Sequence, residues 1–485
     1  MDSKDVDVVI IGAGLSGIGA ACHLTTRNPT KRYMVLEARD TLGGTWDLFR
    51  YPGIRSDSDM HTLGYSFKPW GQQKAIADGQ DILSYIRETA IEYRVDQHVR
   101  YGHKVETASW DSETARWNLI VLREGKQSLF VNCNFLYCCA GYYRYDGGHM
   151  PEFVGIENFH GKLIHAQKWP EDLDYSDKRV VVIGSGATAI TIVPAMAEKA
   201  EHVTMLQRSP TYVVARPTID KVAELLKRWA PEKIAYRLTR LKNILQQTFF
   251  YQLCRRYPDY VKRNLLHLAR KQLGNDFDLD THLTPRYNPW DQRLCLVPNG
   301  DLFNAVNSSK ASIVTDGISK FTKTGIELES GHSLETDIVV CATGLELLAI
   351  GGITFNVDGQ AVDVSKSVTY KGIMLSGLPN LAIAVGYTNA SWTLKCDLNS
   401  EYVCRLLKYM DRHRYSYCEA RRPQNDFPTL PIIDFSSGYI LRAIDRFPRQ
   451  GHRLPWRLYQ NYFLDLVTLR FGFINNSSMK FVRVS

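Results

Sequence analysis

The sequence predicts an α/β protein, because it contains two glycine-rich patterns of strand, turn, helix and strand, at residues 6–37 and 179–209. A third observation is a stretch over residues 221–275 in which apolar and basic positions alternate at roughly helical spacing. At 485 residues the chain is long enough for two to three domains. We therefore expect two Rossmann-like dinucleotide-binding domains and an inserted helical subdomain.

The first pattern joins the apolar strand at residues 6–11 to a helix through a GxGxxG turn. Its residues are Gly12, Gly14, Leu15, Ser16 and Gly17. The first glycine permits the turn, the second lets the backbone approach a pyrophosphate, and the third packs the helix on the strand. Glu37 lies twenty residues beyond Gly17, where it is placed to accept hydrogen bonds from a ribose.

The second pattern is GxGxxA, and its next strand ends in arginine instead of an acid. Its residues are Gly184, Ser185, Gly186, Ala187 and Thr188, followed by Arg208 and Ser209. An arginine there pairs with a 2′-phosphate, so NADPH is favoured over NADH, although a solvated surface charge is the other interpretation. Two dinucleotide folds in one chain indicate that one holds a flavin and the other delivers hydride. The fold with Glu37 suits FAD.

Composition excludes several classes of protein. The net charge is +8, and residues 221–271 alone hold 13 Lys and Arg against 3 Asp and Glu, without an aromatic-basic module that reads bases. We expect no nucleic-acid partner. The ten cysteines are scattered without CxxC or zinc spacing, so we expect reduced, mostly buried thiols and no metal site. No secretory leader or spanning apolar run is recognisable, which favours a cytoplasmic protein.

Two further motifs point to a family. FHGKLIHAQKWP at residues 159–170 matches FxGxxxHxxxW through Phe159, Gly161, His165 and Trp169. GGTWDLFRYPGIRSD, which ends at Asp57, resembles the GGxWxxxxYPGxxxD segment of the same proteins. The sequence thus resembles Baeyer-Villiger monooxygenases, which are class B flavoprotein monooxygenases, over essentially its full length. It looks closest to their EthA-like, ethionamide-activating branch.

The resemblance implies the activity and the site. Such enzymes use NADPH, FAD and O2 to form a C4a-peroxyflavin, which inserts oxygen into ketones to give esters and also oxygenates the sulfur of sulfides or thioamides. By similarity, Arg293 stabilises the peroxide anion and the later oxyanion, and Asp57 orients Arg293. The segment with Gly44, Thr45, Trp46 and Asp57 borders the flavin, although Trp46 also suits a core position. His165 is expected in a hinge more than in acid-base chemistry, with Phe159 and Trp169 as its anchors.

These inferences give expected domain limits. We expect an FAD-binding domain at residues 1–145 and 344–485, the latter with the C-terminal tail. We expect an NADPH-binding domain at residues 146–215 and 286–343 and a helical insert at 216–285.

Three alternatives stay open. One is a related N- or S-oxygenating enzyme that uses a hydroperoxyflavin electrophile. A flavin disulfide reductase is disfavoured because Trp46, not a cysteine pair, follows the GG turn. In a third, non-enzymatic interpretation, the basic insert binds a membrane or a partner. Peripheral membrane contact is also compatible with catalysis, although an insert whose apolar face covers the substrate tunnel is the favoured interpretation.

Overall fold

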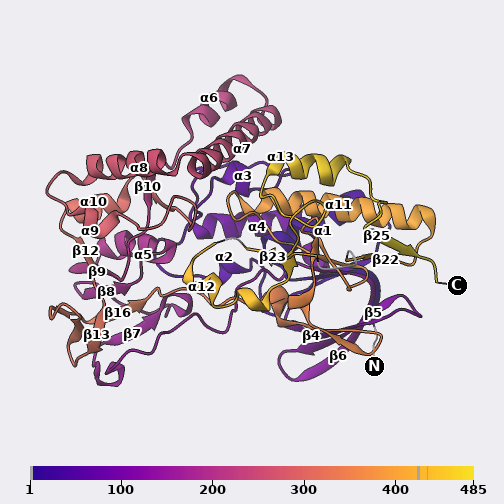
Figure 1. Ribbon diagram of the computed structural model, residues 1–485, viewed down its shortest axis with the longest axis horizontal. Helices are drawn as coiled ribbons and strands as arrows, with labels where there is room; N and C mark the ends of the chain where they lie inside the picture. The colour runs from indigo at the N-terminus through magenta and orange to yellow at the C-terminus, as the bar shows by residue number, and fades with distance from the viewer. Residues whose placement is uncertain (1–3, 423–426, 434, 485) are drawn as a thin grey trace.

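The computed structural model describes residues 4–422, 427–433 and 435–484, and it contains two sheets that lie side by side (Figure 1). The larger sheet has eleven strands, drawn from the beginning of the chain and from residues after 353. They are β1 (Lys4–Ile11), β2 (Tyr33–Leu36), β3 (Val99–Arg100), β4 (His103–Asp111), β5 (Arg116–Arg123), β6 (Gln127–Cys138), β17 (Thr354–Val357), β18 (Gln360–Val362), β19 (Thr369–Tyr370), β20 (Met374–Leu375) and β21 (Leu381–Ile383).

The nucleotide-binding part of this sheet is parallel. Strand β1 pairs in parallel with β2 and β6, and the helix α1 (Leu15–Arg27) connects β1 to β2. Val8, Val9 and Ile10 are fully buried, as a strand covered on both faces requires. Helix α11 (Trp392–His413) packs on α1 and brings the C-terminal half of the chain to this domain.

The second sheet is parallel throughout, in the order β12-β9-β8-β16-β7. Its strands are β7 (Lys162–His165), β8 (Arg179–Ile183), β9 (His202–Gln207), β12 (Ala311–Thr315) and β16 (Ile338–Cys341). Helix α5 (Ala187–Ala197) connects β8 to β9 and contacts both.

Two crossing segments connect the sheets, and they bond to each other. The backbone N–H of Arg144 donates to Glu346 O at 2.8 Å, and that of Leu348 donates to Tyr142 O at 2.9 Å. Further along, the N–H of His149 donates to Gly344 O at 3.0 Å. The segment that leaves the larger sheet and the segment that returns to it are therefore hydrogen-bonded to each other and form one connection between the two sheets.

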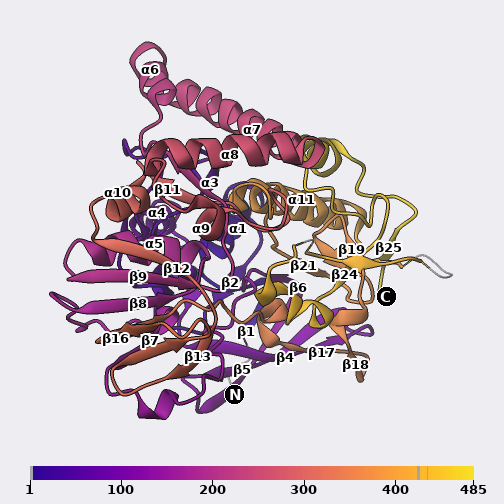
Figure 2. The ribbon, with the colours of Figure 1, turned by 60° about the vertical axis from the view of Figure 1, so that its left-hand side comes forward.

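The helical insert consists of α6 (Lys221–Trp229), α7 (Glu232–Arg256), α8 (Pro258–Leu273) and α9 (Leu279–Leu283). Pro231 precedes α7 and Pro258 begins α8, because proline lacks the backbone donor that a helix interior needs. Helix α6 and the first turns of α7 project from the body of the molecule (Figure 2).

Short elements complete the fold. They are α2 (Thr45–Leu48), α3 (Met60–Leu63), α4 (Gly79–Glu92), α10 (Asp301–Asn307), α12 (Gly438–Leu441) and α13 (Tyr462–Asp465), with the strand pairs β10 (Val213–Arg216) and β11 (Cys295–Pro298), β22 (Tyr417–Ala420) and β25 (Met479–Val482), β23 (Leu430–Pro431) and β24 (Arg449–Gln450), and the hairpin strands β13 (Ile318–Phe321), β14 (Gly325–Leu328) and β15 (Ser333–Glu335). The predicted fold class is confirmed. All ten cysteines are buried free thiols, as expected. Within the described ranges, no helix has both the length and the apolar character needed to span a bilayer.

Candidate active site

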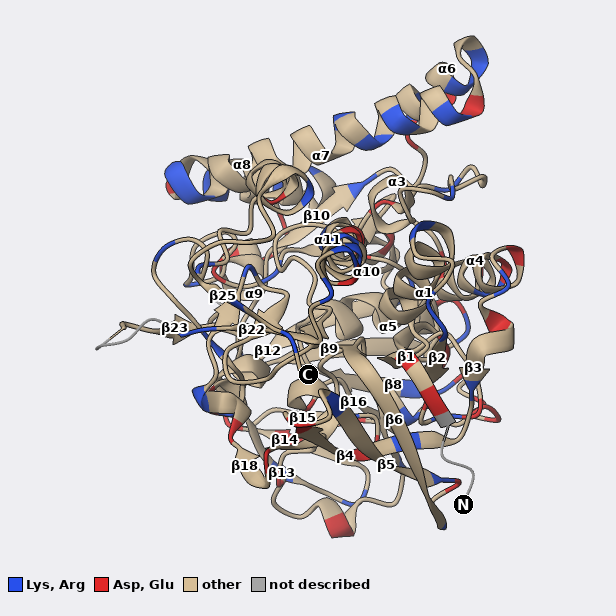
Figure 3. Ribbon diagram, turned by 90° about the vertical axis from the view of Figure 1, so that its right-hand side faces the viewer, with Lys and Arg blue, Asp and Glu red and all other residues tan. Residues whose placement is uncertain are grey.

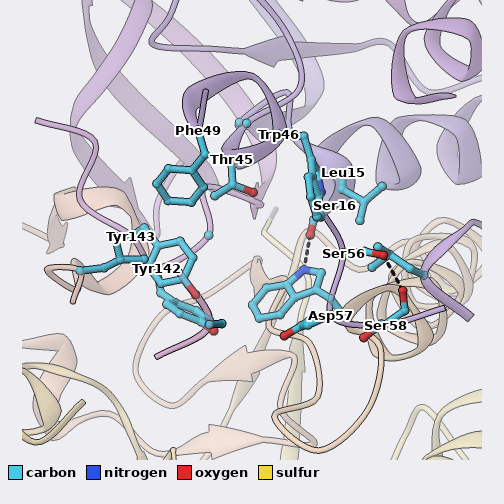
Figure 4. A pocket seen from close by; sticks show the side chains of 18 of the residues that line it. Leu15, Ser16, Thr45, Trp46, Phe49, Ser56, Asp57, Ser58, Tyr142 and Tyr143 are labelled. Atoms are coloured by element: carbon cyan, nitrogen blue, oxygen red, sulfur yellow. Dashed lines mark hydrogen bonds between the residues drawn. The ribbon is translucent and has the colours of Figure 1, made fainter. Parts of the chain in front are cut away.

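A cavity of about 880 Å³ is lined by segments of both nucleotide folds (Figure 4). Of the residues predicted for the site, its wall includes Gly12, Gly14, Leu15, Ser16, Glu37, Gly44, Thr45, Trp46, Asp57, Ala187, Thr188 and Arg293. Its volume lies near the top of the range of about 300–1,000 Å³ typical of ligand sites. The first fold thus contributes most of the predicted wall.

The first glycine turn is tightly packed. Gly12 has φ +98°, and a Cβ there would lie 2.8 Å from Cys139 O, whereas a Cβ on Gly17 would lie 1.8 Å from Gly12 O. The Glu37 carboxylate accepts the backbone N–H groups of Ala13 at 2.7 Å and Arg39 at 2.9 Å. Burial raises the pKa of Glu37. Glu37 therefore holds the turn while it borders the cavity.

The GGTW segment lies against this turn. Gly44 has φ +59°, and a Cβ there would lie only 3.0 Å from Gly14 Cα, so the two backbones need glycine to approach so closely. Trp46 borders the cavity and also packs, half-buried, on the core beneath α1. Trp46 thus borders the cavity, as expected of a residue beside the flavin, and also contacts the core, as expected of a structural residue.

Arg293 and Asp57 form an ion pair on the cavity wall, with Arg293 Nη1 and Asp57 Oδ2 2.9 Å apart. The side chain of Arg293 is 32% exposed and that of Asp57 is 47% exposed. Burial disfavours the guanidinium charge, but Asp57 and three neighbouring tyrosines together outweigh this, and the pKa of Arg293 lies well above its ordinary value. A permanent cation thus borders the cavity.

Trp392 was not identified from the sequence as a site residue. Its indole Nε1 donates to Ser16 Oγ at 2.7 Å, and its ring lies 5.3 Å from that of Tyr142. Tyr142 and Tyr143 line the same wall from the crossing segment. Trp392 and Ser16 are 376 positions apart, so no local pattern could have paired them.

The second glycine turn is open at the start of α5. Gly184 has φ +142°, and a Cβ there would lie 2.5 Å from Ala342 O. Gly186 and Ala187 are exposed at the helix N-terminus, where backbone N–H groups favour an anion. Gly184, Ser185, Gly186, Arg208 and Ser209 are not part of the cavity wall; Arg208 and Ser209 are exposed just after β9.

None of the four FxGxxxHxxxW residues is part of the cavity wall, and His165 lies against a crossing segment. His165 ends β7, its Nδ1 accepts the N–H of Gln167 at 3.2 Å, and a Cβ on Gly148 would lie 2.0 Å from its ring. Burial lowers the pKa of His165, which favours its neutral form.

The other three residues of the FxGxxxHxxxW motif pack in the second domain. The rings of Phe159 and Phe321 are 5.8 Å apart, a Cβ on Gly161 would lie 2.5 Å from Asp337 O, and Trp169 packs on the domain core.

Comparison with known proteins identifies the family. A model of the flavin-binding monooxygenase-like family matches residues 5–410. The chain belongs to this family. This flavin-binding monooxygenase-like protein is 53% identical to the FAD-containing monooxygenase EthA of Mycobacterium tuberculosis strain H37Rv over 482 residues, which cover 99% of this chain and 98% of EthA. It is 46% identical to the probable FAD-binding monooxygenase AlmA of Acinetobacter sp over 480 residues, which cover 99% of this chain and 96% of AlmA. The EthA-like resemblance is confirmed.

Solved structures agree in fold. A steroid monooxygenase bound to NADP has a TM-score of 0.78 at 21% identity, with 99% of this chain and 100% of that one covered. An open crystal structure of cyclohexanone monooxygenase has a TM-score of 0.75 at 18% identity and the same coverage. As a monooxygenase of this family, the protein acts on a small molecule and O2.

Proposed function

We propose that this flavin-binding monooxygenase-like protein is an FAD-dependent, NADPH-consuming enzyme of the Baeyer-Villiger type. It converts a ketone, O2, NADPH and a proton into an ester, NADP+ and water, and it also oxygenates the sulfur of sulfides or thioamides. The proposal rests on the Arg293–Asp57 ion pair on the wall of the cavity.

The cavity residues fit a flavin dinucleotide. Gly14 and Gly44 lie close together on the cavity wall. Because neither has a side chain that would block a ligand, the backbone itself borders the cavity there, and Glu37 borders the same space. When bound, the reduced flavin would supply the electrons that activate O2, and O2 would supply the oxygen atom that is transferred. Trp46 and Thr45 would border it, and the start of α1 would face its phosphates.

Arg293 would stabilise the negative charge that develops on the substrate carbonyl oxygen. A guanidinium suits this task because it keeps its proton and offers several N–H donors in a fixed plane. Asp57 would position Arg293 and offset its charge when no substrate is present. A cation held in place by the protein stabilises a developing charge without the reorganisation that solvent would require.

The second fold would hold NADPH. The open N-terminus of α5 suits the pyrophosphate, with Ser185 and Thr188 near it in the sequence. Arg208 would bind the 2′-phosphate, with Ser209 next to it in the chain. Because the nicotinamide and the substrate need the same side of one flavin, the domains would move about the crossing segments. We propose that His165, packed against Gly148, acts in this hinge with Phe159, Gly161 and Trp169. The domain limits expected from the sequence are part of the same proposal.

The reaction can be tested on the purified, flavin-loaded protein. We expect NADPH to bleach the flavin absorbance without air, and a panel of ketones and sulfides added with labelled O2 to give esters and sulfoxides with one labelled oxygen. Protein that binds no flavin, or that releases only hydrogen peroxide with every acceptor, would contradict the proposal.

Replacing Asp57 by alanine should slow oxygenation by about 10-fold or more, because Arg293 loses the partner that orients it. Flavin content and the rate of anaerobic reduction should stay near the wild-type values. Asp57→Asn is the matched variant: it keeps a hydrogen-bond acceptor and should retain more activity. Unchanged product formation in Asp57→Ala would exclude the positioning role.

Replacing Glu37 by glutamine should weaken FAD binding by roughly 10-fold, because a hydrogen bond to a charged acceptor is replaced by one to a neutral amide. The fraction of protein that retains flavin after dialysis measures this. Glu329→Gln, an exposed change in the second domain, is the control. Full flavin retention in Glu37→Gln would show that the ribose is held elsewhere.

We also propose peripheral contact between the helical insert and a membrane. The support is the excess of ten positive charges over residues 221–271 and the exposed apolar side chains of α6 and α7.

A further inference from the structure

Helix α7 has a polar face that is bound to the body of the molecule. Arg240 Nη1 donates to the carbonyl oxygens of His61 at 2.9 Å and Gly64 at 2.7 Å. Asn243 Nδ2 and Gln247 Nε2 each donate to the Asp59 carboxylate at 2.8 Å. These bonds fix the rotation of α7 about its axis, so its opposite face must point outward.

The outward face of α7 is an apolar stripe. Its members are Ile234, Leu238, Leu241, Leu245 and Phe249, whose exposed fractions lie between 46% and 68%. The first four precede Tyr236, Arg240, Asn243 and Gln247 by two positions each, which is about 200° of helical rotation. Large apolar side chains scattered singly are ordinary on a surface, but a continuous row is not.

Helix α6 extends this surface. Val222, Leu225 and Trp229 are 47%, 54% and 83% exposed, and α6 projects from the body together with the first turns of α7 (Figures 1 and 2). We call these three residues and the five of α7 the outer stripe.

Cations surround the outer stripe. Lys221, Arg228, Lys233 and Arg237 are exposed on the same two helices, and in the described part of the chain none of them has an acidic partner within 4.0 Å. Figure 3 shows the Lys and Arg positions of α6 and α7 in blue. An apolar row flanked by unpaired cations is the arrangement of a helix that lies in the interface of an anionic bilayer.

We infer that the outer stripe and its cations form a docking surface for anionic lipid bilayers. The inference deepens the proposed membrane contact and holds whichever oxygen transfer the cavity performs. A second copy of the chain is the other apolar partner to consider. Pairing two such surfaces would bring together two segments with ten excess positive charges each, whereas anionic lipid neutralises them. Charge complementarity therefore favours lipid.

The surface also lies close to the substrate cavity. Gln247 and Phe250 of α7 line the cavity, on the side of the helix that faces the body. Docking through the outer stripe would place the cavity one helix away from the membrane, where ketones and sulfides that partition into lipid are concentrated.

Vesicle co-sedimentation of the full, flavin-loaded chain tests the inference. We expect binding to phosphatidylcholine vesicles that contain phosphatidylglycerol and little binding to phosphatidylcholine alone. The double variants Leu225→Ser with Trp229→Ser, and Lys233→Gln with Arg237→Gln, should each weaken binding at least about 10-fold. Added salt should weaken wild-type binding.

Matched control variants show whether a loss of vesicle binding is specific to the outer stripe and its cations. Val154→Ser removes an apolar side chain that is 71% exposed elsewhere, and Lys126→Gln with Arg412→Gln removes two exposed cations elsewhere. Both controls should bind vesicles like the wild type, and all variants should keep wild-type activity on a water-soluble ketone without lipid. The absence of phosphatidylglycerol-dependent binding, or equal binding by the stripe variants, would overturn the inference. So would a dimer in solution that the stripe variants abolish, since a second copy would then occupy the surface.

Discussion

Replacing Arg293 by alanine is expected to leave flavin reduction by NADPH intact and to lower ester formation by about 10²- to 10³-fold. The magnitude is that of removing one donor aimed at a developing oxyanion. Hydride transfer precedes the step in which that charge appears, so the two rates should separate. Anaerobic stopped-flow reduction and ester yield under O2 measure them independently.

Arg293→Lys provides the matched variant for this experiment. Lysine keeps the positive charge but lacks the planar set of donors, so we expect an activity between those of wild type and Arg293→Ala. Consumption of NADPH should become uncoupled from the ester and yield hydrogen peroxide instead. Wild-type ester yield in Arg293→Ala would remove this residue from the mechanism. Loss of ketone oxidation with full retention of sulfide oxidation would favour a separate, electrophilic route for sulfur.

Local patterns were sufficient to predict the elements that build the site. A strand followed by a glycine turn and a helix needs only neighbouring residues, and both such units have the predicted order. Likewise, Pro231 and Pro258 mark the breaks between the helices of the insert because proline acts on its own backbone. The pairing of Arg293 with Asp57 came from family resemblance, since the two are 236 positions apart.

Contacts that join distant segments could not be predicted in this way. Trp392 reaches Ser16 only because α11 packs on α1, and no periodicity encodes that packing.

Helix α7 is a second case. Its pattern defines a polar and an apolar face, and a helix on a globular protein normally buries the apolar one. Here Arg240, Asn243 and Gln247 have backbone and carboxylate partners on the side that faces the body. Ile244 is buried on that side as well, and Phe250 lines the cavity. Helix α7 therefore has apolar side chains on both sides, and the exposed apolar row is the feature that the pattern did not predict.

Replacing Arg208 by alanine is expected to raise the NADPH concentration needed for flavin reduction by about 10- to 100-fold. This range corresponds to one charge-assisted contact with a phosphate, worth roughly 1.5–3 kcal/mol. Arg208 is exposed directly after β9, and within the described residues no hydrogen bond or ion pair holds its side chain, so its guanidinium is available to a ligand.

The comparison with NADH makes this prediction specific to the 2′-phosphate. NADH lacks that group, so the KM for NADH in Arg208→Ala should match the wild-type value. The preference for NADPH over NADH should therefore fall by the same factor as the affinity of the enzyme for NADPH. Lys199→Ala removes an exposed cation just beyond the C-terminal end of α5, far along the helix from Gly184, and should change neither KM. Equal losses for NADPH and NADH in Arg208→Ala would mean that the side chain supports the domain or the pyrophosphate, and the discrimination would then have to come from other residues near the second glycine turn.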